Sequence, residues 1–200
     1  MKALVASRVG RLRLLAVLLV LTASLSACSS GNTDAGGGQQ FKFTGATPAG
    51  ELIAPGERSP APSFTGELLD GSSFESTSLA GNPAVLNFWG SWCPPCRVET
   101  PDLQAVYTDV EADGVNFLGV DVKDERQLAK AFVADVGAQY PSLFDPRGEV
   151  ALAFRGFPAN VIPSTIVLDK DGRVAAVYTG QITQETLRTA LASLLKEGGS

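Results

Sequence analysis

The fold of this chain is decided at one stretch, which reads Ala84-Val85-Leu86-Asn87-Phe88-Trp89-Gly90-Ser91-Trp92-Cys93-Pro94-Pro95-Cys96. An apolar run of strand length leads into a Gly-Ser turn, and two cysteines follow at the start of a predicted helix. A Cys-x-x-Cys pair at a strand-to-helix junction is typical of a redox-active dithiol. The helix dipole and the free backbone N–H groups at such a terminus lower the pKa of a thiol. Pro94 and Pro95 suit the first helical turn, where a missing N–H costs least.

Three other uses of the cysteine pair fit the sequence less well. A zinc site needs four ligands, but the chain has one further cysteine, Cys28, and no histidine. A c-type haem site requires a histidine directly after the second cysteine, where Arg97 stands. A structural disulfide remains open, although so short a loop closes little chain entropy. The redox interpretation is therefore preferred.

The motif Trp92-Cys93-Pro94-Pro95-Cys96 after an apolar strand resembles the thioredoxin superfamily. The longer pattern from Leu86 to Cys93 resembles its extracytoplasmic TlpA/ResA branch of membrane-anchored thiol-disulfide oxidoreductases. The resemblance covers about residues 59–197. It implies an α/β, thioredoxin-like fold with a central mixed β-sheet flanked by helices, an N-terminal β-hairpin and an inserted helix-strand element.

The pattern of residues predicts where these elements lie. Strands are expected at 63–69, 72–75, 84–89, 115–121, 140–144, 164–168 and 173–178. Helices are expected at 76–80, 94–111, 124–136, 149–154 and 183–196. In the helix over 124–136, the spacing of Leu128, Phe132 and Val136 predicts an apolar face. Phe41–Thr44 alternates like a short strand, with Leu52-Ile53 as its expected partner.

The N-terminal region predicts export. Residues 1–27 combine a basic leader with the apolar run Leu14–Leu21, which suits a signal peptide and is too short to span a bilayer. The end of this segment, Leu25-Ser26-Ala27-Cys28, resembles a bacterial lipobox, which implies a lipid on Cys28; an ordinary Ala-type cleavage site is the alternative. We expect a flexible Gly/Ser-rich tether over residues 28–40, a short accessory segment without assigned chemistry over 41–58, and the thioredoxin-like domain over 59–200.

The charge and composition of the chain limit the classes of partner that it is expected to bind. The chain carries a formal net charge of −5, and its predicted signal peptide contains basic but no acidic residues, so the mature protein is more acidic still. An acidic protein without basic clusters is a poor ligand for nucleic acid or for anionic lipid headgroups. We therefore expect attachment to the extracytoplasmic face of the cell membrane through the lipid, with no nucleic acid, cofactor or metal ion.

A second segment, far from the cysteines in the sequence, is expected to lie beside them in the folded protein. Val161-Ile162-Pro163-Ser164-Thr165 matches the proline loop of the superfamily, which implies a cis Pro163 that faces the cysteine pair; a trans proline at a strand start is the alternative. A cis proline would leave the backbone of Ile162 free to pair with a substrate strand. Trp92 is expected at the rim of the substrate groove, beside Pro94 and Pro95, and Trp89 in the core.

The expected roles follow from position in the motif. Cys93 would attack a substrate disulfide, and Cys96, the more buried sulfur, would resolve the mixed disulfide. Glu99 lies on the same helical stripe, where the resemblance implies a part in proton transfer; the alternative is a solvated acid stabilised by the helix dipole. Asn87 stands where thioredoxin has an aspartate, which leaves Glu99 as the leading acid.

The direction of electron flow is less determined by the sequence. No histidine lies between the cysteines, and Arg97 supplies a single charge, so we expect a reductant of protein disulfides. The resemblance implies that it receives its electrons from a membrane dithiol donor. The resemblance implies clients that include the haem-binding cysteines of apocytochrome c. The alternatives are a DsbA-like oxidase, a thiol peroxidase, whose Pro-x-x-x-Thr-x-x-Cys pattern is absent before Cys93, and a lipoprotein that only binds a partner.

Overall fold

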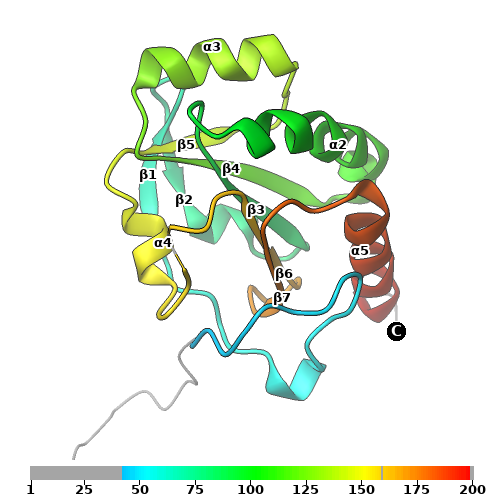
Figure 1. The fold of residues 1–200 in the computed structure, drawn as a ribbon. Helices are drawn as coiled ribbons and strands as arrows, with labels where there is room; N and C mark the ends of the chain where they lie inside the picture. Colours follow the sequence, from blue (N-terminus) through cyan, green and yellow to red (C-terminus); the bar gives the residue numbers. More distant parts are fainter. Residues whose placement is uncertain (1–41, 159, 199–200) are drawn as a thin grey trace, which may run out of the picture. The chain divides into compact units, whose positions relative to one another are not determined.

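The structure is a computed structural model that describes residues 42–158 and 160–198. Its strands form one mixed sheet in the order β2-β1-β5-β4-β3-β6-β7, as the predicted thioredoxin-like fold requires (Figure 1). The strands are β1 (Thr65–Leu68), β2 (Ser73–Glu75), β3 (Ala84–Trp89), β4 (Asn116–Val122), β5 (Ser142–Asp145), β6 (Ser164–Leu168) and β7 (Val174–Thr179). The helices are α2 (Pro94–Val110), α3 (Arg126–Val136), α4 (Glu149–Ala153) and α5 (Gln184–Gly198). Short 3-10 helices lie at Pro55–Glu57, Ser76–Leu79 and Glu111–Asp113.

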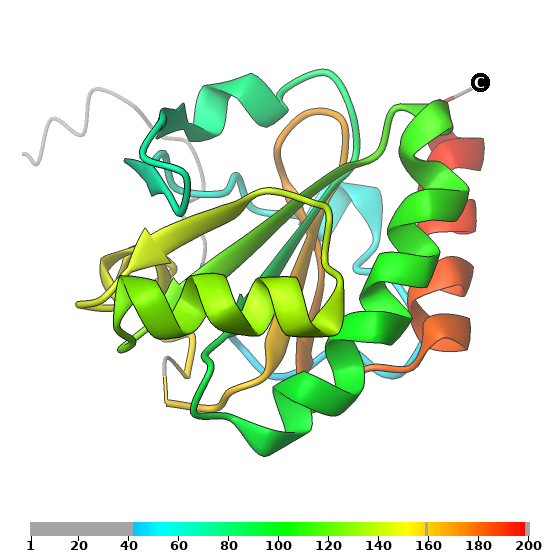
Figure 2. The same cartoon turned by 90° about the horizontal axis from the view of Figure 1, so that it is seen from above.

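Both faces of the sheet are covered, which explains why every residue of β3 is buried. Alternate side chains of a strand point to opposite faces. Leu86 and Phe88 belong to the apolar cluster that includes α4, whereas Val85 belongs to the cluster formed with α2 and α5. At the end of the strand, Trp89 stacks on Phe132 of α3 with ring centroids 4.7 Å apart. Helices α2 and α3 cross the same face of the sheet in Figure 2.

A polar row crosses the centre of the sheet beneath the start of α2. Asn87 on β3 lies opposite Thr165 on β6 and Gly119 on β4, and Gly119 lies opposite Ser142 on β5. A Cβ atom at Gly119 would lie 2.3 Å from Ser142 Oγ and 2.7 Å from Trp89 Nε1, so a side chain does not fit there. The pairing register therefore collects polar groups at the one place where the sheet meets the cysteine motif.

The predicted strand at the N-terminal edge is wrong for the residues that the structure describes. Residues 42–44 and Leu52-Ile53 are not strands and do not pair with each other. The Phe43 N–H instead donates to the Arg155 carbonyl (2.9 Å), and the Ile53 N–H donates to the Ala175 carbonyl of β7 (2.7 Å). Each segment thus makes isolated contacts with a later part of the chain, which a local alternation of residues does not reveal. Phe41 lies outside the described residues.

The accessory segment ends at a buried arginine. Arg58 is 2 % exposed, and its guanidinium binds Asp169 (3.2 Å), Glu197 (2.8 Å) and the Ile53 carbonyl (2.8 Å). Because a buried cation needs partners of opposite charge, these contacts fix the segment against the turn before β7 and against α5.

The apolar face of α3 also differs from the expected one. Phe132 is buried, together with Ala129, but Leu128 is 54 % exposed. At the start of the helix, the buried position is Ala129 and not the neighbouring Leu128 that we expected. The small side chain of Ala129 packs in the interior, and the larger Leu128 does not.

The predicted signal peptide, the lipidated Cys28 and the tether lie outside the described residues. Within the described part of the chain, no helix is long and apolar enough to cross a membrane.

Candidate active site

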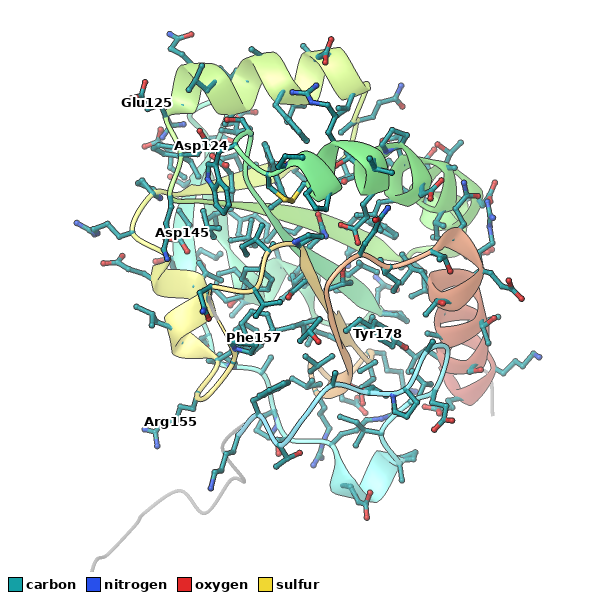
Figure 3. The ribbon with its side chains drawn as sticks, in the orientation of Figure 1. Asp124, Glu125, Asp145, Arg155, Phe157 and Tyr178 are labelled. Atoms are coloured by element: carbon teal, nitrogen blue, oxygen red, sulfur yellow. A yellow bond between two sulfur atoms is a disulfide. The ribbon has the colours of Figure 1, made fainter. Side chains whose placement is uncertain are left out.

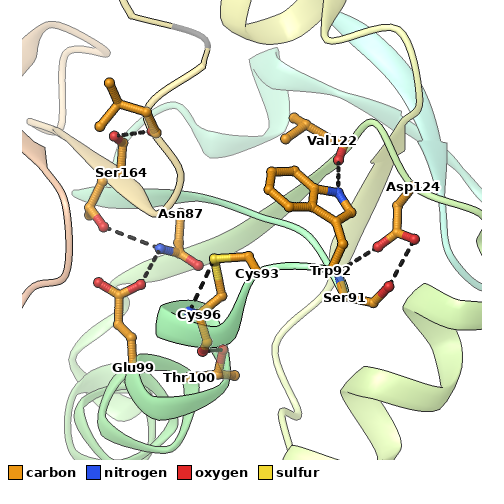
Figure 4. Close-up of a disulfide and its surroundings, with 12 residues drawn as sticks. Asn87, Ser91, Trp92, Cys93, Cys96, Glu99, Thr100, Val122, Asp124 and Ser164 are labelled. Carbon is orange, nitrogen blue, oxygen red and sulfur yellow. Dashed lines mark hydrogen bonds between the residues drawn. A yellow bond between two sulfur atoms is a disulfide. The ribbon is translucent and has the colours of Figure 1, made fainter.

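A disulfide joins Cys93 and Cys96 at the start of α2 (Figures 3 and 4). Cys93 is the N-cap residue, and Pro94 and Pro95 occupy the first two helical positions. The Cys93 sulfur accepts a hydrogen bond from the backbone N–H of Cys96 (3.2 Å). Both cysteines are buried, and Cys96 (0 % exposed) is the more buried of the two, as expected, with Cys93 2 % exposed. The helix terminus is thus placed to stabilise negative charge on Cys93.

The loop that carries Cys93 is held by the region after β4. Asp124 accepts hydrogen bonds from the Ser91 N–H (2.5 Å) and the Ser91 hydroxyl (2.9 Å). Trp92 Nε1 donates to the Val122 carbonyl (3.1 Å), as Figure 4 shows. A Cβ atom at Gly90 would lie 2.5 Å from the Trp92 Nε1 atom, so glycine makes room for this indole. These contacts fix the approach to the cysteine pair.

Glu99 is fully buried, which excludes the alternative of a solvated surface acid. Its carboxyl group accepts hydrogen bonds from Asn87 Nδ2 on β3 (3.2 Å) and from the Ile182 N–H before α5 (2.7 Å). Burial disfavours the charged form and raises the pKa of Glu99 to about 7, although the two hydrogen bonds act in the opposite direction. A carboxyl group in this range can both take up and release a proton near neutral pH.

Arg97 does not add its charge to the cysteines. Its guanidinium forms an ion pair with Asp135 of α3 and stacks over the ring of Phe132, 4.9 Å from the centroid. The cation is therefore paired on the side of α2 that faces α3, and the backbone N–H of Cys96 is the donor that contacts Cys93.

The proline loop lies where the sequence predicted it. The Ile162–Pro163 peptide bond is cis, as expected. Pro163 is buried, and Ile162 packs against the apolar cluster that contains Cys93, Cys96 and Trp89. Residues far apart in the sequence thus meet beside the disulfide.

The surface around the disulfide is apolar. Trp92 is 51 % exposed and Val98 is 64 % exposed, and Pro94 and Pro95 between them are exposed as well. Trp92 lies at the edge of a groove between the start of α2 and α3. The groove is lined by Ser91, Trp92, Arg97, Lys123, Asp124, Glu125, Leu128, Ala131, Phe132, Asp135 and Pro146.

Sequence reasoning missed four groups at or near the site. Asp124 lies two residues after the end of β4, and in the sequence it was interpreted only as the start of the next helix. Thr165 contacts Asn87 because of strand register, and Ile182 contributes a backbone N–H, so neither carried a signal in the sequence. Asp121, also not anticipated, is fully buried, and burial together with the charges of Asp124 and Asp145 raises its pKa to about 8.

Comparison with known proteins places this site in a family. The family model described as "AhpC/TSA family" matches residues 58–177. The chain belongs to the AhpC/TSA family. It is 32 % identical over 144 residues to the thiol-disulfide oxidoreductase ResA of Geobacillus thermodenitrificans, which covers 72 % of this chain and 81 % of that protein. It is 31 % identical to ResA of Bacillus subtilis over 142 residues, 71 % of this chain and 77 % of that protein.

Solved structures agree with these relatives. A DsbF homologue from Corynebacterium diphtheriae is 38 % identical with a TM-score of 0.70, and the match covers 78 % of this chain and 99 % of that one. A secreted thiol-disulfide isomerase from Corynebacterium glutamicum is 34 % identical with a TM-score of 0.71, with the same coverage of both chains. This AhpC/TSA family member is therefore a thiol-disulfide oxidoreductase of the thioredoxin superfamily.

The burial of Glu99 predicts how stability depends on pH. Its pKa is raised from 4.5 to about 7 in the folded protein, so between these pH values the unfolded chain binds fewer protons. The contribution of Glu99 to the free energy of unfolding should therefore fall as pH rises through this window, by at most roughly 3 kcal/mol, and level off above it. Glu99→Gln should remove this contribution, while that of Asp121, whose pKa is raised to about 8, remains. Urea unfolding of the oxidised wild type and of oxidised Glu99→Gln, each at pH 5 and pH 8, measures this contribution. Asp121 is present in both proteins, so its effect on the free energy of unfolding cancels in the comparison. Parallel pH profiles would contradict a buried, neutral Glu99.

Proposed function

We propose that this AhpC/TSA family member reduces disulfide bonds of exported proteins at the extracytoplasmic face of the cell membrane. The observation that carries the proposal is the N-cap position of the Cys93 sulfur, one helical turn from Cys96 and two turns from the buried acid Glu99. This arrangement combines a stabilised nucleophile with a nearby proton acceptor.

The proposed reaction begins with reduced cysteines. The Cys93 thiolate attacks one sulfur of the client disulfide and forms a mixed disulfide, and the other client sulfur leaves as a thiolate. The Glu99 carboxylate then takes the proton of the Cys96 thiol, and the Cys96 sulfur attacks Cys93. The client leaves as a dithiol and the Cys93–Cys96 disulfide forms, so two electrons pass to the client. A membrane dithiol donor returns the enzyme to the reduced form.

The apolar surface around Cys93 supports a protein client. Exposed Trp92, Pro94, Pro95 and Val98 would contact apolar segments of an incompletely folded chain, because contiguous apolar surface marks interaction sites. The client backbone would pair with Ile162, next to Pro163. On the strength of the resemblance to the TlpA/ResA branch, we include the haem-binding cysteines of apocytochrome c among the clients.

The electrostatics of the site support reduction over oxidation. A strong oxidant such as DsbA, at about −120 mV, stabilises its reduced form, whereas thioredoxin lies near −270 mV. Pro94 and Pro95 supply no backbone N–H, and Arg97 is paired with Asp135. Few groups are therefore available to stabilise a Cys93 thiolate beyond the Cys96 N–H.

The reduction potential of the cysteine pair tests this proposal. Equilibration with glutathione buffers, in a Cys28→Ser background so that only Cys93 and Cys96 titrate, should give a value more negative than about −200 mV. A value near −120 mV would instead favour the DsbA-like oxidase, for which the hydrogen bond from Cys96 N–H to the Cys93 sulfur is the supporting observation. Turnover of insulin disulfides without consumption of hydrogen peroxide separates the reductase from a thiol peroxidase and from a binding lipoprotein.

The roles of the two cysteines make a second prediction. Cys96→Ser should accumulate mixed disulfides with client proteins, because the sulfur that resolves them is absent. Cys93→Ser should form none. Non-reducing electrophoresis of the exported protein fraction, compared between the two variants, reads out the difference. Equal trapping by both variants, or trapping by Cys93→Ser alone, would assign the roles differently.

The lipid anchor is proposed from the sequence Leu25-Ser26-Ala27-Cys28. Cys28→Ser should release the protein from the membrane fraction or block its processing, while its potential and its insulin reductase activity stay unchanged. Cys93→Ser, which leaves the lipobox intact, should remain in the membrane fraction. Intact-mass analysis of the mature protein provides the direct measurement, and an unmodified Cys28 would overturn the anchor.

A further inference from the structure

Asn87 is a buried polar side chain that the proposed reaction does not use. It is 1 % exposed and lies on the sheet face beneath the first turns of α2. A buried polar group retained in an otherwise apolar strand calls for a physical reason, because its desolvation must be offset by hydrogen bonds.

The amide nitrogen of Asn87 has the hydrogen bonds that a buried polar group needs. Nδ2 donates to Glu99 Oε2 (3.2 Å) and to Thr165 Oγ1 (3.3 Å), which uses both of its hydrogens. These two contacts occupy the nitrogen side of the planar amide and leave its oxygen on the opposite side.

The amide oxygen of Asn87, Oδ1, differs from the nitrogen in this respect. Oδ1 is buried and has no hydrogen-bond partner among the described residues in this oxidised state. In Figure 4 it points toward the sulfur atoms of Cys93 and Cys96, on the side of Asn87 away from Glu99. A disulfide has no hydrogen to donate, so the oxidised site leaves this acceptor unpaired at a cost in free energy.

Reduction changes the chemistry that faces this oxygen. Two glutathione molecules supply two electrons and two protons, the Cys93–Cys96 bond breaks, and two S–H groups form as oxidised glutathione is released. A thiol is a weak hydrogen-bond donor, and Cys96 is the fully buried member of the pair.

We infer that Asn87 Oδ1 accepts the S–H hydrogen of reduced Cys96, so that Asn87 is a positioning residue that stabilises the reduced form and sets the redox equilibrium. The acceptor is unpaired in one redox state and paired in the other. Asn87 thereby makes the pair more oxidising than it would be with an apolar residue at this position. The inference requires only thiol-disulfide exchange and holds for either direction of electron flow.

The equilibrium constant with glutathione tests the inference. Asn87→Leu removes the oxygen and keeps the number and branching of the side-chain heavy atoms, and it should favour the oxidised form about tenfold, equivalent to a potential about 30 mV more negative. The comparison is made at pH 6, where most of Glu99 is protonated because its pKa is about 7, so a change in its ionisation contributes little. An unchanged equilibrium constant in a folded variant would overturn the inference.

Thr165→Val is the matched control. It removes the other partner of the Asn87 amide nitrogen and leaves Oδ1 in place, so the equilibrium constant should stay within about twofold of the wild type. A tenfold shift in this variant as well would mean that any disturbance of the polar row changes the potential, and the specific role of Oδ1 would be rejected. Because each value is read relative to the wild type, the result does not depend on whether the enzyme is a reductase.

The thiol itself provides a readout that does not require Asn87→Leu to fold. The infrared S–H band of Cys96 is isolated as the difference between Cys93→Ser and the double variant Cys93→Ser/Cys96→Ser. We expect this band at the lower frequency of a hydrogen-bonded thiol, and a shift to the free-thiol frequency when Asn87→Leu is added. A free-thiol band in Cys93→Ser would overturn the inference by itself.

Discussion

The geometry of the site depends on the hydrogen bonds that the buried carboxyl group of Glu99 accepts. This carboxyl group extends from α2 and accepts hydrogen bonds from β3, through Asn87, and from the backbone before α5, through Ile182. Two consecutive elements, β3 and α2, and the segment before α5, which is far away in the sequence, are thus fixed around one buried acid. A buried polar group without partners is costly, so loosening any of these elements would expose or unpair the others. The cysteine pair is positioned by the same helix that carries this acid.

Two acidic groups near the site are buried, whereas the arginine on α2 lies at the surface. Glu99 and Asp121 are buried and their pKa values are raised, whereas the nearest cation on α2, Arg97, is paired with Asp135 at the surface. The helix N-terminus supplies positive potential at Cys93. The two acids with raised pKa values are thus buried, whereas the exposed surface formed by Trp92 and the two prolines beside the disulfide is uncharged and apolar.

Local patterns were sufficient for most of the fold and failed where a partner lay far away in the chain. Strands β3 and β6 were predicted with the observed bounds, since a run of apolar residues between turn signals is a local property. The expected strand near Phe43 was wrong because its backbone bonds to Arg155 and not to a neighbouring segment. Leu128 was assigned to the wrong side of its helix for a related reason, because the position of the sheet and not the spacing alone decides which residues face it.

The sequence by itself determined the chemistry of this protein: the two cysteines, their spacing, the prolines between them and the helix they begin are all contained in residues 93–96. Spacing along one helix also placed Glu99 on the side of the cysteines. Only the tertiary structure decided that Glu99 is buried, that Asn87 donates to it, and that Asp124 holds the loop before Cys93. Burial and hydrogen bonding depend on strand register and on the packing of α2 over the sheet, and those are relations between distant segments that no local pattern encodes.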